Sequence, residues 1–174
     1  LWLQSLLQTA QAAFWAEACA AVAKLPPATR EGLEIRELPI AVAAARFRPA
    51  LLELGREQLY AQVQARRATR GREVMASLEG YREGHSETLY AQRDRMRWGD
   101  LAAMSLAMDI VDDPAIRAAL FHLGDRDLQD RSTEYGGVIT VERDGRPKLT
   151  ECKPRSIGND LRFEAPQSMF DLGY

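Results

Sequence analysis

Residues 137–153 have the sequence GVITVERDGRPKLTECK, and this stretch decides the fold class. Two runs that contain β-branched residues, 137–142 and 148–153, flank an Asp-Gly pair at positions 144 and 145. An Asp-Gly pair between two such runs is a strong signal for a β-hairpin with a two-residue turn. We therefore predict an antiparallel hairpin here, followed by a third extended piece at 161–164.

The residues before the hairpin follow a helical period instead. Apolar residues spaced three or four apart predict a first helix that the proline pair at 26–27 ends. Pro39 predicts the start of a short helix, and Pro49 predicts a longer one that runs to about Thr69. The apolar stripe of the first helix consists of Leu3, Leu7, Ala10, Phe14 and Ala18.

Three further helices are predicted, at about 71–80, 87–111 and 114–130. The second of these is apolar on most sides in its middle, so we expect it to be the most buried segment. The third has the strongest start in the sequence, because Asp113 can cap the helix and Pro114 fits its first position. The apolar residues of this third helix are Ile116, Ala119, Leu120, Leu123 and Leu128.

Together these patterns predict an α+β fold in which helices and strands are segregated along the chain. Residues 1–131 form the predicted helical region, and residues 132–174 form the predicted β region. The apolar content of 46% is enough to bury a sizeable core. The chain starts at Leu1 instead of Met and ends at Tyr174 soon after apolar residues, so we expect a piece of a longer protein in which the β region begins a further domain.

Composition excludes several classes of function. The formal net charge is only -2, so the chain has no overall field that would hold nucleic acid or an anionic membrane. Polar residues interrupt the apolar run at 1–23, which argues against a membrane span and against a signal peptide. Cys19 and Cys152 are too few and too far apart for a disulfide framework or a zinc knuckle, so we expect a reducing compartment, the cytoplasm.

Glu151 and Lys153 form an E-x-K pattern whose two charged side chains share one face of a strand. The pattern resembles the half-motif of PD-(D/E)xK nucleases. The resemblance implies that Glu151 helps hold a divalent metal, that Lys153 assists the attacking water, and that a second acid lies on the neighbouring strand. A two-residue turn places Glu151 opposite Val138, and only Gly136, Gly137 and Val138 occupy the positions where that acid is needed. The simpler interpretation of the pattern is a solvated charge pair on the strand.

A second constellation lies at residues 133–139, whose sequence TEYGGVI places an acid at the start of a strand, then two glycines and β-branched residues. It resembles the opening strand of JAB/MPN-type (JAMM) zinc metalloproteases. The resemblance implies that Glu134 is the general acid/base that takes a proton from zinc-bound water, and that Gly136 and Gly137 let the strand pack closely. The simpler interpretation is a carboxylate at the start of a strand, with glycines that serve a tight turn or a bulge.

The zinc ligands of that family do not follow the motif in this chain. The family holds zinc with a His-x-His pair and a later aspartate, whereas His85 and His122 are isolated histidines. We therefore expect no zinc on residues 1–174, and expect zinc only if the longer protein supplies the missing ligands.

Three functional hypotheses follow from these motifs. The first is the front portion of a JAB-like zinc-dependent hydrolase or peptidase, inactive as a fragment, with Glu134 as the catalytic residue. The second is a non-catalytic helical module that binds a protein or peptide partner and exposes apolar surface on its first helix, at Trp2, Phe14 and Trp15. The third is a divalent-metal nuclease that uses Glu151 and Lys153.

Overall fold

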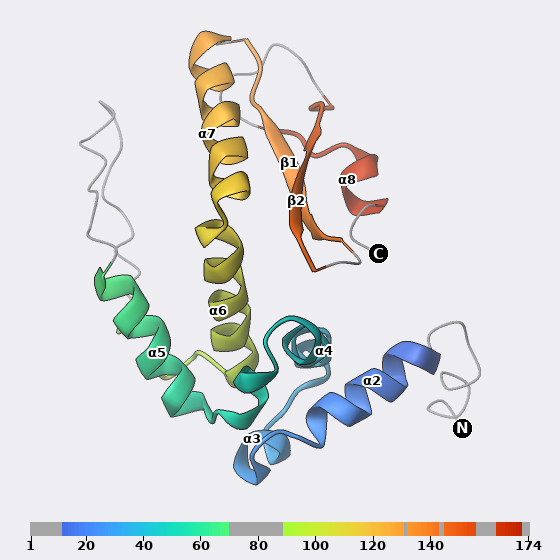
Figure 1. The fold of residues 1–174 in the computed structure, drawn as a ribbon, viewed down its shortest axis with the longest axis vertical. Helices are drawn as coiled ribbons and strands as arrows, with labels where there is room; N and C mark the ends of the chain where they lie inside the picture. Colours follow the sequence, from blue (N-terminus) through green and yellow to red (C-terminus); the bar gives the residue numbers. More distant parts are fainter. Residues whose placement is uncertain (1–11, 70–88, 131, 143–144, 156–162, 172–174) are drawn as a thin grey trace. The chain divides into compact units, whose positions relative to one another are not determined.

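The structure, a computed structural model, describes residues 12–69, 89–130, 132–142, 145–155 and 163–171 (Figure 1). This part of the chain is mainly helical and ends in one antiparallel pair of strands, so the predicted α+β class is confirmed. The chain forms two compact units, Leu1–Leu106 and Ala107–Tyr174. The boundary between them falls inside helix α6 (Trp98–Asp112). None of the helices in the described ranges is both long and apolar enough to cross a membrane.

The first unit is a set of short helices around a small core. It contains α2 (Ala12–Val22), α3 (Pro27–Glu31), η1 (Ile35–Glu37), α4 (Leu38–Phe47), η2 (Pro49–Glu53), α5 (Arg56–Thr69) and the first part of α6. Helix α4 packs against α2 and η2, and small alanine side chains at this contact let the backbones approach closely. The core is formed by Ala18, Ala21, Ala41, Val42, Ala44, Leu51, Leu52, Leu59, Val63, Leu101 and Ala102.

The segment predicted as one helix from Pro49 to Thr69 is broken in two, so that prediction was wrong. The 3₁₀ turn η2 ends at Glu53, and Leu54 is extended, with φ -97° and ψ 135°. The carbonyl oxygen of Leu54 accepts a hydrogen bond of 3.0 Å from the indole Nε1 of Trp98. A tertiary hydrogen bond from a residue far along the chain therefore satisfies a carbonyl at the point where the helix stops.

Helix α6 begins at Trp98, well after the predicted start near residue 87. The amide of Arg97 donates a hydrogen bond of 2.8 Å to the Asp100 carboxylate, which caps this helix start. Residues 89–95 form turns, and the helix predicted at 71–80 lies outside the described residues. Only the first half of α6 is well buried, with its buried residues at Trp98, Gly99, Leu101, Ala102 and Ser105.

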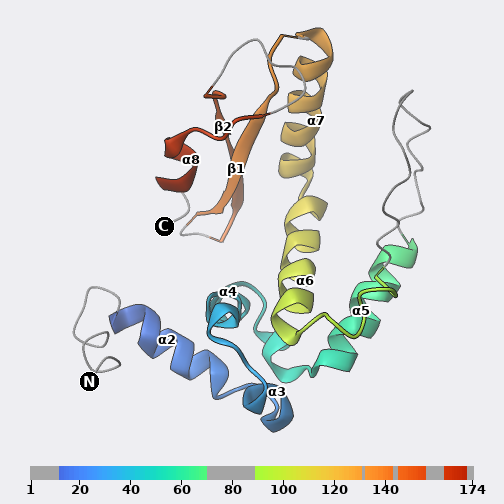
Figure 2. The same cartoon turned by 180° about the vertical axis from the view of Figure 1, so that it is seen from behind.

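The second unit contains the last part of α6, helix α7 (Pro114–Gln129), strands β1 (Gly136–Val141) and β2 (Pro147–Cys152), and helix α8 (Gln167–Asp171). The predicted start of α7 is confirmed, because the carboxylate of Asp113 accepts hydrogen bonds from the amides of Ala115 and Ile116. The hairpin lies beside α7, and α8 lies on the other side of the hairpin (Figures 1 and 2). Ile116 is the buried residue of α7, whereas Leu120 and Leu128, which belong to its predicted apolar stripe, are exposed.

The predicted hairpin is confirmed, but its register differs by one residue from the prediction. Glu151 pairs with Gly137, and not with Val138. The amide of Glu142 donates to the carbonyl of Arg146, which closes a three-residue loop, and Gly145 adopts a left-handed φ of 84°. A three-residue loop with a left-handed third residue is a common alternative to the two-residue turn that an Asp-Gly pair predicts.

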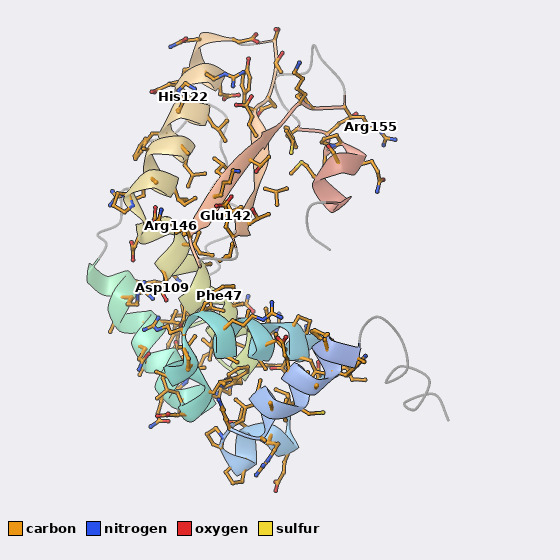
Figure 3. All side chains as sticks on the ribbon, turned by 45° about the vertical axis from the view of Figure 1, so that its right-hand side comes forward. Phe47, Asp109, His122, Glu142, Arg146 and Arg155 are labelled. Atoms are coloured by element: carbon orange, nitrogen blue, oxygen red, sulfur yellow. The ribbon has the colours of Figure 1, made fainter. Side chains whose placement is uncertain are left out.

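The two ends of the hairpin are separated along its length. Figure 3 shows Glu142 and Arg146 at the closed end and Arg155 near the open end. The amide of Arg155 donates a hydrogen bond of 2.9 Å to the carbonyl of Glu164, which holds the following segment against the hairpin. Of the third extended piece predicted at 161–164, residues 161–162 lie outside the described residues, and residues 163–164 are not in a strand.

Candidate functional site

The first candidate site surrounds Glu134, two residues before the start of β1. Glu134 is half-buried and directly precedes Tyr135 and the two glycines of the strand. Within the described part of the chain, no hydrogen bond or ion pair engages its carboxylate. As far as the described residues go, both oxygens of this carboxylate are therefore without a partner.

Gly136 and Gly137 are glycines because neighbouring atoms leave no room for a side chain. A Cβ at Gly136 would lie 2.8 Å from Cε2 of the Phe163 ring. A Cβ at Gly137 would lie 2.5 Å from the carbonyl oxygen of Thr150 and 3.2 Å from the Cα of Glu151. The strand pairing is continuous through both glycines, so they serve close packing and not a bulge.

A hydrogen-bonded turn connects α7 to the strand that follows Glu134. The Asp130 carboxylate accepts hydrogen bonds from the Ser132 hydroxyl at 2.5 Å, the Ser132 amide at 2.9 Å and the Tyr135 hydroxyl at 2.9 Å. These donors, above all the Ser132 hydroxyl, lower the pKa of Asp130 from 3.8 to about 2. Asp130 therefore stays ionised down to strongly acidic pH.

Glu151, the acid of the E-x-K pattern, is engaged by an arginine from α7. The guanidinium of Arg126 lies 2.5 Å from the Glu151 carboxylate and 4.2 Å from the centroid of the Tyr135 ring. The hydrogen bond from Arg126 to Glu151 is the main cause that raises the pKa of Arg126. Lys153 lies just beyond β2 and is exposed. Among the described residues, the strand register and the side-chain contacts place Gly137 and Arg126, and no second acid, beside Glu151.

The second candidate site is a groove of about 840 Å³ in the first unit. Its walls come from α3, η1, the start of α5 and the segment at 94–98. Glu37 lies beside it and is only 4% exposed. One oxygen of the Glu37 carboxylate accepts from the Gly99 amide at 2.7 Å, and the other accepts from the Glu34 amide at 2.8 Å and from Arg97 Nε at 3.0 Å.

The groove walls are held together by their own polar groups. Arg97 also pairs with the Glu34 carboxylate at 3.0 Å and donates to the carbonyl of Gly32. Arg56 donates to the carbonyl of Met96 at 2.7 Å and also to the carbonyl of Arg93. These donors already form hydrogen bonds within the fold. We therefore interpret the groove as the contact region, here called the seam, that attaches residues 93–98 to the helices, and not as a ligand site.

The sequence did not predict that the Glu37 carboxylate is buried with its partners Glu34, Arg97 and Gly99, a set that we call the Glu37 cluster. A charged residue in a connector usually indicates a solvated loop, and the partners Arg97 and Gly99 follow Glu37 by 60 and 62 positions. The one available signal was local, since Glu34 and Glu37 form a capping box around η1. That signal predicts the start of a helical turn but not the burial of its second carboxylate.

The Glu37 cluster predicts a pH dependence for the first unit. Burial acts to raise the pKa of Glu37, but the Glu34 and Gly99 amides and Arg97 outweigh it, so the folded pKa lies below 4.5. A lowered folded pKa stabilises the unit above about pH 4.5, and this contribution falls as the pH drops through the folded pKa. All three tryptophans, at 2, 15 and 98, lie in this unit, so their fluorescence reports its unfolding.

We expect the urea midpoint from tryptophan fluorescence to be steady between pH 7 and pH 5.5 and to decrease below pH 4.5. In Glu37→Gln the midpoint at pH 7 is expected to be lower and its decrease below pH 4.5 shallower. An equally steep decrease in both proteins would contradict the assignment to Glu37.

The described part of the chain offers no group of side chains that fits a metal site. No three His, Cys, Asp or Glu side chains of the described residues form a group that could hold a metal ion. His122 lies exposed on α7 (Figure 3), and His85 is outside the described residues. Comparisons with protein-family models, curated proteins and solved structures found no match.

Proposed function

We propose that the hairpin is the opening of the catalytic domain of a JAB-like zinc-dependent hydrolase, with Glu134 as its general acid/base. The observation that supports this proposal is the contrast between two acids. Glu134 has no partner among the described residues, whereas Glu151 is held by Arg126. A carboxylate that exchanges protons with water needs an oxygen that no cation occupies. The close packing at Gly136 and Gly137 is what the resemblance to that family implies for this strand.

The residues described do not form a zinc site, so the proposal assigns no step to the metal. This chain then has two roles, to carry the proton-handling carboxylate of Glu134 and to supply strand β1, which begins two residues later. Under this proposal the zinc ligands lie outside the residues that the structure describes.

The test uses the complete natural reading frame that contains these residues. We expect about one zinc per chain, and hydrolysis of a fluorescent peptide mixture that Glu134→Gln reduces by about 10²- to 10⁴-fold, the usual contribution of a general acid/base. Zinc content should be unchanged, since Glu134 is not a ligand. The matched control is Glu142→Gln, which alters another acid of the same hairpin. A protein without zinc, or hydrolysis that survives Glu134→Gln, would refute the proposal.

The nuclease hypothesis has weaker support. It requires the Glu151 carboxylate to bind a divalent metal, and this carboxylate is paired with Arg126 at 2.5 Å. It also requires an acid on β1, where the observed register puts Gly137 opposite Glu151. Mg²⁺-dependent nicking of DNA that is lost in Lys153→Ala would restore this hypothesis.

A second candidate function is a protein-interaction module, and exposed apolar residues of α7 favour it. Phe121 is 70% exposed and Leu128 is 78% exposed, and seven residues place them on the same side of the helix. The first helix fits this function less well, because Phe14 and Trp15 are half-buried and contact each other edge to face. Trp2 lies outside the described residues. The partner expected is a protein or peptide with an apolar contact surface.

A further inference from the structure

One cation joins three elements of the second unit around Glu134. Arg126, on the last turns of α7, covers the ring of Tyr135 and pairs with Glu151 on β2. The hydroxyl of Tyr135 reaches back to Asp130, at the C-terminal end of the same helix. The ring of Tyr135 is therefore held on its face by a guanidinium and at its tip by a carboxylate.

The segment that carries Glu134 is fixed on both of its sides. On the N-terminal side the amide and hydroxyl of Ser132 donate to Asp130. On the C-terminal side Tyr135 is held as described, and β1 begins at the next residue. Because peptide bonds are planar, few backbone dihedral angles stay adjustable between Ser132 and Tyr135.

We propose that Arg126 and Tyr135 are positioning residues, which hold the connection from α7 to β1 so that the Glu134 backbone keeps one conformation. The proposal rests on the proposed function only for what Glu134 does. The contacts among Arg126, Asp130, Tyr135 and Glu151, which we call the clamp, are observed independently of that function. A general acid/base needs such support, because a small displacement of a catalytic group costs much of its rate.

A positioning role can be separated from a contribution to overall stability. The side chains of Arg126 and Glu151 are each 36% exposed, and ion pairs at such exposure contribute little to stability. A clamp of this kind should therefore affect the order of the 132–135 segment while leaving the melting temperature nearly unchanged. If these contacts only added stability, their removal would lower the melting temperature and leave the order of residues 132–135 nearly unchanged.

The experiment measures backbone ¹⁵N order parameters along the full chain. In the unaltered protein we expect about 0.85 at Glu134, the value of rigid backbone, and a decrease toward about 0.6 in Arg126→Gln. Arg126→Lys keeps the charge for Glu151 but loses the flat stacking on Tyr135, so it should give an intermediate value. Tyr135→Phe removes only the hydrogen bond to Asp130 and should loosen Glu134 less than Arg126→Gln does. The matched control is Arg117→Gln, an exposed arginine on the same helix.

Two results would overturn the proposal. One is an order parameter at Glu134 that stays unchanged in both Arg126→Gln and Tyr135→Phe. The other is a decrease spread evenly over β1 and β2, which would mark a general packing contact. These outcomes do not depend on catalysis, whereas the zinc and hydrolysis measurements on Glu134→Gln test the proposed function alone. The clamp and the function can therefore fail separately.

Discussion

Glu37→Ala is expected to lower the free energy of unfolding of the first unit by about 3 kcal/mol. This is the lower end of the cost of breaking a buried ion pair, because Glu37 is buried while the Arg97 side chain is 32% exposed. The change removes the acceptor for the Glu34 amide, the Gly99 amide and Arg97 Nε at once. Buried donors without an acceptor each lose their hydration without compensation. The 93–98 segment would also lose its main attachment to η1, so its order should decrease together with the stability.

Urea titration followed by tryptophan fluorescence measures this effect, because all three tryptophans lie in the first unit. Glu53→Ala is the matched control, since it removes an exposed acid of the same unit and should change stability by less than about 0.5 kcal/mol. Gly99→Ala should also be destabilising, because its Cβ would lie 2.7 Å from Cγ of Glu37. Stability equal to that of the Glu53→Ala control would show that Glu37 does not hold the seam together.

Gly137→Ala is expected to disrupt the pairing of β1 with β2 and to lower stability by about 2 kcal/mol, within the usual cost of overpacking. The added Cβ would lie 2.5 Å from the carbonyl oxygen of Thr150, an atom of the paired backbone that cannot rotate away. Gly136→Ala should cost less, because its neighbour is the ring of Phe163, a side chain that can shift. Amide hydrogen exchange at Val138 and Thr150 should therefore accelerate far more in Gly137→Ala than in Gly136→Ala.

The control for these substitutions is Gly124→Ala in α7. No neighbouring atom lies within 4 Å of a Cβ built there. Alanine inside a helix is favoured over glycine by about 0.5–1 kcal/mol, so this change should raise the melting temperature. Equal hydrogen exchange in the Gly137→Ala and Gly124→Ala proteins would mean that the tight contact at Gly137 does not constrain the hairpin.

Features that depend on local chemistry could be predicted from the amino-acid sequence. The Asp113 cap with Pro114 fixed the start of α7, because its donors are only two and three residues away. The alternation around the Asp-Gly pair determined that a hairpin follows the helices, and so the α+β class. The motif around Glu134 could be found in the same way, since its glycines and acid are adjacent in the chain.

Contacts between residues far apart in the chain could not be predicted in this way and became visible in the folded chain. The indole of Trp98 satisfies the carbonyl of Leu54 at the break, and Arg97 and Gly99 complete the Glu37 cluster. Arg126 pairs with Glu151. The observed hairpin register differs from the predicted one because the loop has three residues instead of two. An Asp-Gly pair is compatible with either loop length. The physical reason is common to all of them. Periodicity and capping depend on neighbours within about four residues, whereas a buried polar group is satisfied by whichever partner the folded chain brings near.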